Sequence, residues 1–326
     1  HTPVRGNSGG IPLFPEDITV AEVLKKAGYV TGGFGKWGLG NQGKDGAAER
    51  QGFDLFYGYY NQWHAHTYYT HLFRNSKKVE LNGRYTHHAI FDETIKFIKN
   101  NKDKPFFLYC PWTPPHAAYQ IPEDEPAWKM YKDKPWPHDA RVAAAMDTMM
   151  DRHVGEITAL LKKLDIYQNT LMFFTSDNGA AKRFDGIHNS SGVMQGKKRS
   201  LNEGGIRVPM VVRWPVKIKA GRVSSHPWYF PDVMPTFAEI GGVSTEVPED
   251  IDGISILPTL LDKGVQKQHE YMFWQYGVRA VRSGKWKGIG KGGHLYLYDL
   301  SEDIEEKNDL SSKHPEIAAR MKKYIT

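Results

Sequence analysis

The sequence of 326 residues contains a single cysteine, Cys110, which excludes a disulfide framework and any zinc site built from several cysteines. It also has no apolar run near the ~20 residues that are needed to span a bilayer, so no membrane span is predicted. Neither sign of charge dominates, because 43 basic and 37 acidic residues leave a net charge of +6. This small excess is typical of an ordinary solvated surface, or of a cleft that attracts an anionic substrate.

Nucleic acid is not expected as a partner, because the sequence has no zinc finger, RNA-recognition signature or basic amphipathic helix. Hydrophobic residues make up 40% of the chain and aromatic residues 13%, which is enough to build a sizeable core and excludes disorder. At roughly 150 residues per domain, the length corresponds to about two domains.

The first 214 residues alternate between helices and short apolar strands. A capping box at Thr19–Glu22 begins the first helix, and Gly28 is placed to end it in a left-handed turn. The other predicted elements, in chain order, are a strand at 29–34, a helix at 88–99, a strand at 106–110, a helix at 139–164 and strands at 171–175 and 208–214. This alternation predicts an α/β fold, with a largely parallel sheet sandwiched by helices.

The character of the chain changes after Trp214. A helix is expected at 232–240, followed by a loop-rich stretch. Short aromatic runs at 271–276, 279–288 and 295–300 then predict antiparallel strands, and a helix at 315–324 closes the chain. We therefore expect an α/β domain at 1–265 and a small C-terminal α+β subdomain at 266–326, made of an antiparallel sheet with a terminal helix.

Polar loops follow three of the predicted strands, after Phe34, Cys110 and Thr175. In parallel sheets, ligands bind at the carboxyl ends of the strands. We therefore expect these three loops to meet in space, although they lie far apart in the sequence.

Two of these loops carry a candidate catalytic side chain. Lys36 stands between glycines in GKWGLG, where an ammonium can face an anion, or is simply exposed in a turn. His116 ends TPPH, where two prolines fix the loop. A histidine held in this way can protonate a leaving group near neutral pH, although a plain surface histidine fits the pattern as well.

The third loop, SDNG, places Asp177 and Asn178 directly after a strand. Their oxygens suit calcium or magnesium, but two ligands do not complete a shell of about 6–8 oxygens, and an Asn-Gly turn is common. Downstream, Lys198 lies in the basic loop GKKRSLNEGGIR, which is either solvated or constrained by its glycines. Glu203 is a candidate to anchor that loop by hydrogen bonds.

Taken in order, five motifs resemble the formylglycine-dependent sulfatases, a family of the alkaline-phosphatase superfamily. The resemblance runs from about Pro15 to Pro258, and the aromatic C-terminal subdomain fits it as well. The motifs are GKWGLG, QGFDLFYGY, PWTPPHAAY, SDNG and GKKRSLNEGGIRVPMVVRWP. The resemblance implies an alkaline-phosphatase-like α/β architecture and hydrolysis of an aryl or carbohydrate sulfate.

The resemblance also implies roles for single residues. Asp177 and Asn178 match a pair of ligands to a calcium ion, or to magnesium in its place. Lys198 matches the lysine that bridges the sulfate and the leaving oxygen. His116 matches the histidine that helps to protonate the departing alcohol, and Lys36 matches the lysine near the formylglycine.

The sequence departs from the family pattern at two points. In many members the first loop reads GKWHLG, and its histidine expels sulfate from the covalent intermediate, whereas Gly38 stands here. His64 and His66 are candidates to supply the imidazole, and His66 is preferred, although a packing role fits it equally. The nucleophile motif, Cys or Ser followed by x-P-S-R, and the early Asp-Asp metal pair are also absent.

HTPVRGN at the start resembles the stretch just downstream of the nucleophile helix, so we expect formylglycine to lie in a missing N-terminal segment. The chain on its own is then expected to be inactive. Cys110 does not replace the nucleophile, since YCPWT does not match the motif and the residue lies on a predicted buried strand.

Two alternatives remain open. One is a phosphodiesterase or phosphonate monoester hydrolase of the same superfamily, and the other is a non-catalytic binder of sulfated glycans. The substrate is a sulfated small molecule or glycan, and His66 and His188 are candidates to contact it. A periplasmic or secreted location is expected from the resemblance, and the oligomeric state cannot be read from the sequence.

Overall fold

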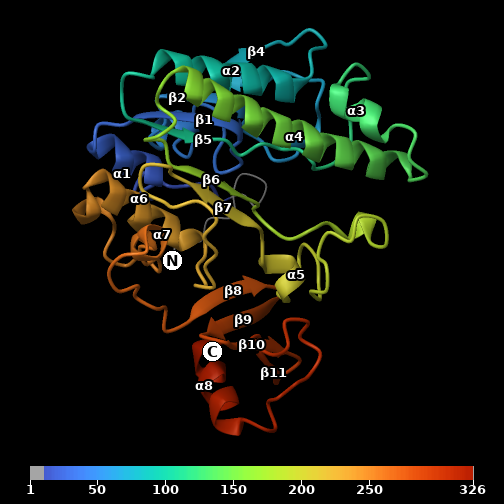
Figure 1. Ribbon diagram of the computed structural model, residues 1–326, viewed down its shortest axis with the longest axis vertical. Coiled ribbons are helices and arrows are strands. Elements are labelled where there is room, and N and C mark those ends of the chain that lie inside the picture. Colours follow the sequence, from blue (N-terminus) through green and yellow to red (C-terminus); the bar gives the residue numbers. More distant parts are fainter. Residues whose placement is uncertain (1–10, 326) are drawn as a thin grey trace. The chain divides into compact units, whose positions relative to one another are not determined.

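The computed structural model describes residues 11–325, so the HTPVRGN segment lies outside the described residues. The chain divides into two compact units (Figure 1), which we describe separately. Unit 1 comprises His1–Thr170 and Phe230–Leu257, and unit 2 comprises Leu171–Tyr229 and Pro258–Thr326. The domain boundary between residues 265 and 266 stays a prediction.

Unit 1 is built on a mixed five-stranded sheet in the order β4-β3-β2-β1-β5. The central strand β1 is parallel to β2 and to β5, whereas β3 and β4 extend the sheet with antiparallel pairings. Because β1, β2 and β5 run in one direction, the loops that follow them leave the same edge of the sheet. The strands are β1 (Val30–Lys36), β2 (Leu55–Tyr59), β3 (Leu72–Arg74), β4 (Lys77–Val79) and β5 (Phe106–Tyr109).

Helices cover both faces of this sheet (Figure 1). On one face, Phe34 of β1 packs in a buried cluster with Ile90 and Phe97 of α2. On the other, Ala21 of α1 packs with Phe53 and Phe56, and Phe237 of α6 meets Phe107 at 6.1 Å between ring centroids. The helices of unit 1 are α1 (Val20–Lys26), α2 (Thr86–Asn100), α3 (Pro126–Tyr131), α4 (His138–Lys163) and α6 (Val233–Gly241), with short 3₁₀ turns η2 (Ala48–Arg50), η3 (His64–His66), η5 (Phe230–Asp232) and η6 (Ser244–Glu246).

The first helix begins as its sequence predicts. The Thr19 side chain accepts a hydrogen bond from the Glu22 amide, and the Glu22 carboxylate accepts one from the Thr19 amide at 2.8 Å. This is a capping box, which gives hydrogen-bond acceptors to backbone amides at the start of the helix that have no carbonyl partner within it. Gly28 follows the helix with φ of +81°, the left-handed conformation that favours glycine.

Unit 2 contains the two strands that were expected to join the parallel sheet. In the described residues they instead pair with each other, antiparallel, with Thr175 opposite Met210. The connection between them contains only short helical turns, and a parallel crossover usually needs a long helix. The elements of this first part of unit 2 are β6 (Met172–Thr175), η4 (Lys182–Phe184), α5 (Glu203–Ile206) and β7 (Met210–Arg213).

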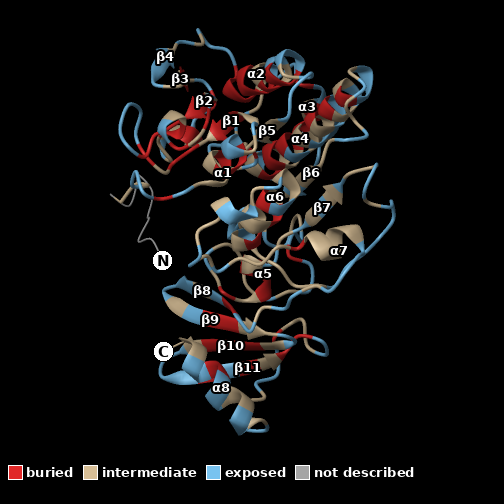
Figure 2. Ribbon diagram, turned by 90° about the vertical axis from the view of Figure 1, so that its left-hand side faces the viewer, coloured by how far each residue is buried: buried red, intermediate tan, exposed pale blue. Residues whose placement is uncertain are grey.

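The C-terminal part of unit 2 is an antiparallel sheet in the order β11-β10-β9-β8, with α8 packed against it. Its core is the buried set Val281, Leu297 and Met321, and buried positions lie on β9, β10 and β11 (Figure 2). The elements are α7 (Leu257–Leu261), β8 (Met272–Tyr276), β9 (Val278–Ser283), β10 (Trp286–Lys291), β11 (His294–Asp299) and α8 (Pro315–Ile325). The predicted fold class, α/β with a small C-terminal antiparallel subdomain, is confirmed.

Among residues 11–325, no helix combines the length and apolar character that crossing a membrane requires.

Candidate functional site

Lys36 is the last residue of β1 and stands at the edge where the loops leave the sheet. Its backbone amide donates to the Pro111 carbonyl at 2.9 Å, and it lies in register with Tyr59 of β2. A Cβ on the preceding Gly35 would lie 2.3 Å from the Pro111 carbonyl oxygen, so only glycine allows the two chains to approach this closely. Among the described residues, the half-buried Lys36 ammonium has no hydrogen-bond or ion-pair partner.

Two histidines, from the loops that follow β2 and β5, meet at the same edge. The His66 and His116 rings are stacked, with centroids 4.0 Å apart and planes inclined by 11°. Backbone contacts fix both residues, since the Ala118 amide donates to the His66 carbonyl at 3.0 Å and the Tyr68 hydroxyl donates to the His116 carbonyl at 2.9 Å. The loops that follow β2 and β5 therefore meet within unit 1, whereas the expected meeting of the loops after Phe34, Cys110 and Thr175 stays a prediction.

Hydrogen bonding also orients the His116 ring. Its Nδ1 lies 3.1 Å from the Ala117 carbonyl oxygen. Because a carbonyl only accepts, this contact requires a proton on Nδ1 and turns Nε2 toward the opposite side of the ring. A ring oriented in this way can exchange a proton at Nε2.

The structure explains why position 38 is a glycine. Its φ is +74°, and a Cβ at this position would lie 2.8 Å from Cγ of Gln62. Gln62 therefore fills the space next to residue 38, and its amide donates to the Gly38 carbonyl at 3.4 Å. A side chain at position 38 would need both a strained backbone and a displaced glutamine.

The SDNG loop leaves β6 in unit 2 and is fastened by backbone contacts. The Gly179 amide donates to the Gly205 carbonyl at 2.9 Å, and the Lys198 amide donates to the Ala180 carbonyl at 2.8 Å. The antiparallel pairing explains this proximity, because the chain that leaves β6 must return to the same edge to enter β7. Asp177, Asn178 and Lys198 thus belong to two adjoining loops.

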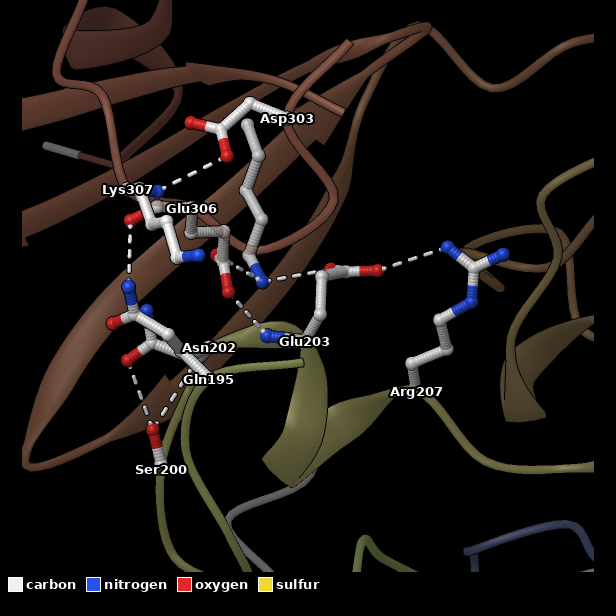
Figure 3. A network of polar contacts seen from close by, with 9 residues as sticks. Gln195, Ser200, Asn202, Glu203, Arg207, Asp303, Glu306 and Lys307 are labelled. Atoms are coloured by element: carbon white, nitrogen blue, oxygen red, sulfur yellow. Dashed lines mark hydrogen bonds and ion pairs between the residues drawn. The ribbon is translucent and has the colours of Figure 1, made fainter. Parts of the chain in front are cut away.

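A buried ionic network holds the Lys198 loop (Figure 3). Lys287 of β10 is fully buried, and its ammonium lies 2.8 Å from a Glu203 oxygen and 2.9 Å from a Glu306 oxygen. The second Glu306 oxygen accepts from the Glu203 amide at 2.6 Å, and the Gln195 amide nitrogen donates to the Glu306 carbonyl at 3.2 Å. Burial alone raises the pKa of Glu203, but the Lys287 charge and hydrogen bond lower it below its usual value.

The Asp177 and Asn178 side chains fit a hard divalent cation as part of its ligand shell. Asn178 uses its amide nitrogen to donate to the Gly179 carbonyl at 3.0 Å, which leaves its amide oxygen available. The exposed Asp177 carboxylate has no hydrogen-bond or ion-pair partner among residues 11–325. No group of three or more His, Cys, Asp and Glu side chains with metal-binding geometry occurs in that range, so these two residues would be only part of a shell.

Two other predicted residues have different surroundings. His188 lies in the β6–β7 connection, with its ring 5.1 Å from that of Phe184. Cys110 follows β5 and is partly buried, and burial raises the pKa of its thiol to about 12, with a smaller opposing effect from Thr94. A thiol with such a pKa is not a thiolate nucleophile at neutral pH.

The structure thus brings the predicted residues into two groups, Lys36, His66 and His116 in unit 1, and Asp177, Asn178 and Lys198 in unit 2. The partners that hold them were not predicted. Lys287 and Glu306 lie far along the chain from the motifs, and Gln62 lies just after QGFDLFYGY without being part of it. Trp63 is a partial exception, because a tryptophan directly before the candidate His64 can be recognised in the sequence.

The sequence matches known families over its whole length. The sulfatase family model covers residues 2–243, and the C-terminal model of N-sulphoglucosamine sulphohydrolase covers residues 195–326. The chain is 31% identical over 305 residues to N-acetylgalactosamine-6-sulfatase of Canis lupus familiaris, covering 86% of this chain and 55% of that protein. It is 29% identical over 302 residues to an arylsulfatase of Hemicentrotus pulcherrimus, covering 85% and 52%. The chain spans about half the length of these curated relatives.

Solved structures agree with this assignment. The crystal structure of Ps i-CgsB in complex with k-i-k-neocarrahexaose matches with a TM-score of 0.83 and 28% identity, covering 99% of this chain and 76% of that chain. The phosphonate monoester hydrolase SpPMH of Silicibacter pomeroyi matches with a TM-score of 0.65 at 16% identity, covering 97% and 80%, a likeness of fold alone. With a family model that extends over most of its residues, this chain belongs to the sulfatase family.

Proposed function

We propose that the protein hydrolyses a sulfate ester, and that Lys36, His116 and Lys198 act in catalysis. The observation that supports this most directly is the meeting of His66 and His116, stacked at 4.0 Å, at the sheet edge where β1 ends in Lys36. An ammonium and an oriented imidazole at the same sheet edge are suited to hold an anionic ester and to protonate its leaving group.

Each side chain has a distinct part in this proposal. The Lys36 and Lys198 ammonium groups bind sulfate oxygens and stabilise the charge that develops on them. His116 donates a proton from Nε2 to the departing alcohol oxygen. His66 supplies the imidazole that position 38 lacks, and His188 contacts the substrate from the β6–β7 connection.

We also propose that Asp177 and Asn178 hold calcium, with magnesium as the alternative. The bound ion would add positive charge opposite the sulfate oxygens. Titration of the full-length protein with calcium, followed by calorimetry, tests this directly. Asp177→Ala should abolish binding, whereas Asp133→Ala, at an exposed aspartate without an ion pair among the described residues, should not. Equal binding by both variants would contradict the assignment.

A sulfated carbohydrate is the substrate class that we favour. Trp63 is 72% exposed, and its ring lies edge-on to His66 at 5.9 Å, so it offers a free face beside the candidate site. Sugar rings pack on such faces. Relatives named for N-acetylgalactosamine-6-sulfate and a solved complex with a carrageenan oligosaccharide support the same class.

Matched esters separate this proposal from a phosphorus-ester hydrolase. The full-length protein, with calcium, should hydrolyse 4-nitrophenyl sulfate faster than 4-nitrophenyl phosphate or the corresponding phosphonate ester. Relative to the uncatalysed rate of each ester, it should accelerate the hydrolysis of sulfated galactosamine more than that of 4-nitrophenyl sulfate. A preference for either phosphorus ester would favour the phosphodiesterase or phosphonate monoester hydrolase alternative.

None of the residues assigned above is proposed as the nucleophile. No Cys/Ser-x-P-S-R motif occurs in the 326-residue sequence, so we propose that this chain alone binds sulfate esters without turning them over and that formylglycine is supplied by a further segment. Turnover of 4-nitrophenyl sulfate by the isolated chain would refute this. Absence of the motif from the full-length protein would favour the non-catalytic glycan binder.

We propose a periplasmic or secreted location on the basis of the family resemblance. Fractionation of cells that express the full-length protein tests it, and recovery of all the protein in the cytoplasm would contradict it.

A further inference from the structure

A second polar pocket lies in unit 1, beside the loops that follow β1 and β2. Its volume is about 450 Å³, within the range of about 300–1,000 Å³ that is common for small-ligand sites. Its walls come from residues 41–44 after β1 and from the segment between β2 and β3. The lining residues are Asn41, Gln42, Lys44, Tyr60, Asn61, His64, His71 and Phe73. We call it the Lys44 pocket.

The charge of the Lys44 pocket is positive. None of its described lining residues is acidic, and the exposed Lys44 ammonium forms no hydrogen bond or ion pair within residues 11–325. Glu49, which is partly buried, accepts from the Ser76 hydroxyl and from the hydroxyl of Tyr60, a lining residue, so this carboxylate is already hydrogen-bonded. A negatively charged group that enters the pocket therefore meets the Lys44 ammonium and no acidic side chain among the described lining residues.

Two neutral imidazoles also line the pocket. The His64 and His71 rings lie 4.3 Å apart between centroids, and His64 Nε2 contacts the Thr70 hydroxyl at 3.0 Å. Burial, with smaller effects from His71 and Lys78, lowers the pKa of His64 to about 4. Burial and Lys78 also lower the pKa of His71, against an opposing effect of Glu80, which is paired with Lys78 at 2.6 Å. Both rings thus supply contact area and hydrogen bonds without charge at neutral pH.

One turn of 3₁₀ helix separates the Lys44 pocket from the candidate site. His64 lines the pocket, Ala65 is fully buried, and His66 stacks on His116. With three residues per turn and a rise of ~2 Å per residue, His64 and His66 point about 120° apart and are offset by only ~4 Å along the axis. A ligand in the pocket is therefore the immediate neighbour of a group held at His116.

We infer that the Lys44 pocket recognises a second anionic group of the substrate, a carboxylate or a sulfate on the sugar next to the one that bears the scissile sulfate. This inference rests on the proposed function, since it assigns a neighbour to that ester. Lys44 pairs with the anion, and His71, whose ring nitrogens have no partner among the described residues, donates or accepts a hydrogen bond from the same sugar.

Equilibrium binding to the 326-residue chain tests the inference without any need for turnover. Three disaccharides with the same scissile sulfate are compared by calorimetry: one with a uronic acid as the second sugar, its carboxyl-reduced counterpart with an uncharged second sugar, and one with a sulfate in place of the carboxylate. We expect either disaccharide with a charged second sugar to bind about 10-fold more tightly than the one whose second sugar is uncharged, the ratio that ~1.4 kcal/mol produces. The arm that shows the larger preference identifies the anion.

Lys44→Ala should abolish this preference, so that the disaccharides bind with about equal affinity, because it removes the only lysine among the described lining residues. Lys104→Ala is the matched control, since Lys104 is exposed, unpaired among the described residues and precedes β5 at the opposite edge of the sheet. No preference in the wild-type chain, or an unchanged preference in Lys44→Ala, would overturn the inference.

Hydrolysis of 4-nitrophenyl sulfate by the full-length protein tests the proposed function separately, because this ester has no second anionic group. Turnover without an anion preference would overturn the present inference alone. An anion preference without turnover would overturn the proposed function and leave the pocket's specificity in place.

Discussion

At the scale of single residues, the chemistry of the site depends on two imidazole rings in contact. His116 is oriented through Nδ1 by a carbonyl, and its ring is covered on one face by His66. Such an arrangement fixes where Nε2 can deliver a proton, and a positioned general acid typically contributes ~10²–10⁴-fold to the rate.

We expect His116→Ala, in the full-length protein, to lower kcat/KM for a sugar sulfate by about 100-fold or more. The loss should be much smaller for 4-nitrophenyl sulfate, since nitrophenolate leaves without a proton. Steady-state rates on both esters give the comparison. Equal losses on the two esters would contradict a role for His116 in protonating the leaving group.

His66 gives the matched second variant from the same stacked pair. If it supplies the base that position 38 lacks, His66→Ala should slow the release of sulfate more than the release of alcohol, so that alcohol appears in a burst. Rapid-quench measurements separate the two products. A variant that releases both together at the wild-type rate would leave His66 with a packing role only.

At the scale of elements, the Lys198 loop depends on the C-terminal sheet through a buried lysine between two glutamates. Removing one member of a buried ion pair typically costs ~3–5 kcal/mol, because the remaining charge stays buried without a partner. We expect Lys287→Met to lower the free energy of unfolding by about this amount in urea titrations. Lys307→Met is the matched control, since it removes an exposed pair with Glu305 and should lower the free energy of unfolding much less. An equal loss of unfolding free energy in the two variants would contradict a larger contribution from the buried ion pair.

A second element-scale feature is the contact of α2 with α4 through two buried histidines. His87 Nε2 and His153 Nδ1 lie 3.0 Å apart. Burial lowers the pKa of His87 well below its usual value, with further effects of His153, His88 and Arg152. Burial, with Arg152 and His88, also lowers the pKa of His153 to about 3, and Glu125 pairs with both His88 and Arg152.

Since both folded-state pKa values lie below the unfolded value of about 6.5, stability should be complete above that pH and fall as the pH drops toward 3. Each histidine adds a slope of up to ~1.4 kcal/mol per pH unit. Urea titrations between pH 7.5 and 5 measure the slope. His153→Phe should reduce it, and His138→Gln, at an exposed position of the same helix, should not. A slope unchanged by His153→Phe would contradict this assignment.

The sequence predicted most elements because local signals specify them. The capping box at Thr19, the apolar strand 106–110 and the helix 139–164 correspond to α1, β5 and α4. The antiparallel pairing of β6 with β7 was not predicted, since an apolar run does not reveal its partner or direction. The same limit applies to the site: motifs located Lys36 and His116, whereas Gln62 and Lys287 act through contacts that arise only on folding.

At the scale of the whole molecule, the proposed function depends on residues of both units. Unit 1 presents Lys36, His66 and His116, and unit 2 presents Asp177, Asn178 and Lys198. The roles proposed for Lys36, His116 and Lys198 assign both groups to the hydrolysis of one sulfate ester. The family membership of the chain supports this proposal.

The most direct test is a crystal structure of the protein grown with calcium and sulfate. We predict one calcium ion ligated by Asp177 and Asn178, and one sulfate ion that contacts the Lys36 and Lys198 ammonium groups together with the His116 ring. A calcium ion bound elsewhere, or Lys36 and Lys198 too far apart to share a sulfate, would contradict the central claim.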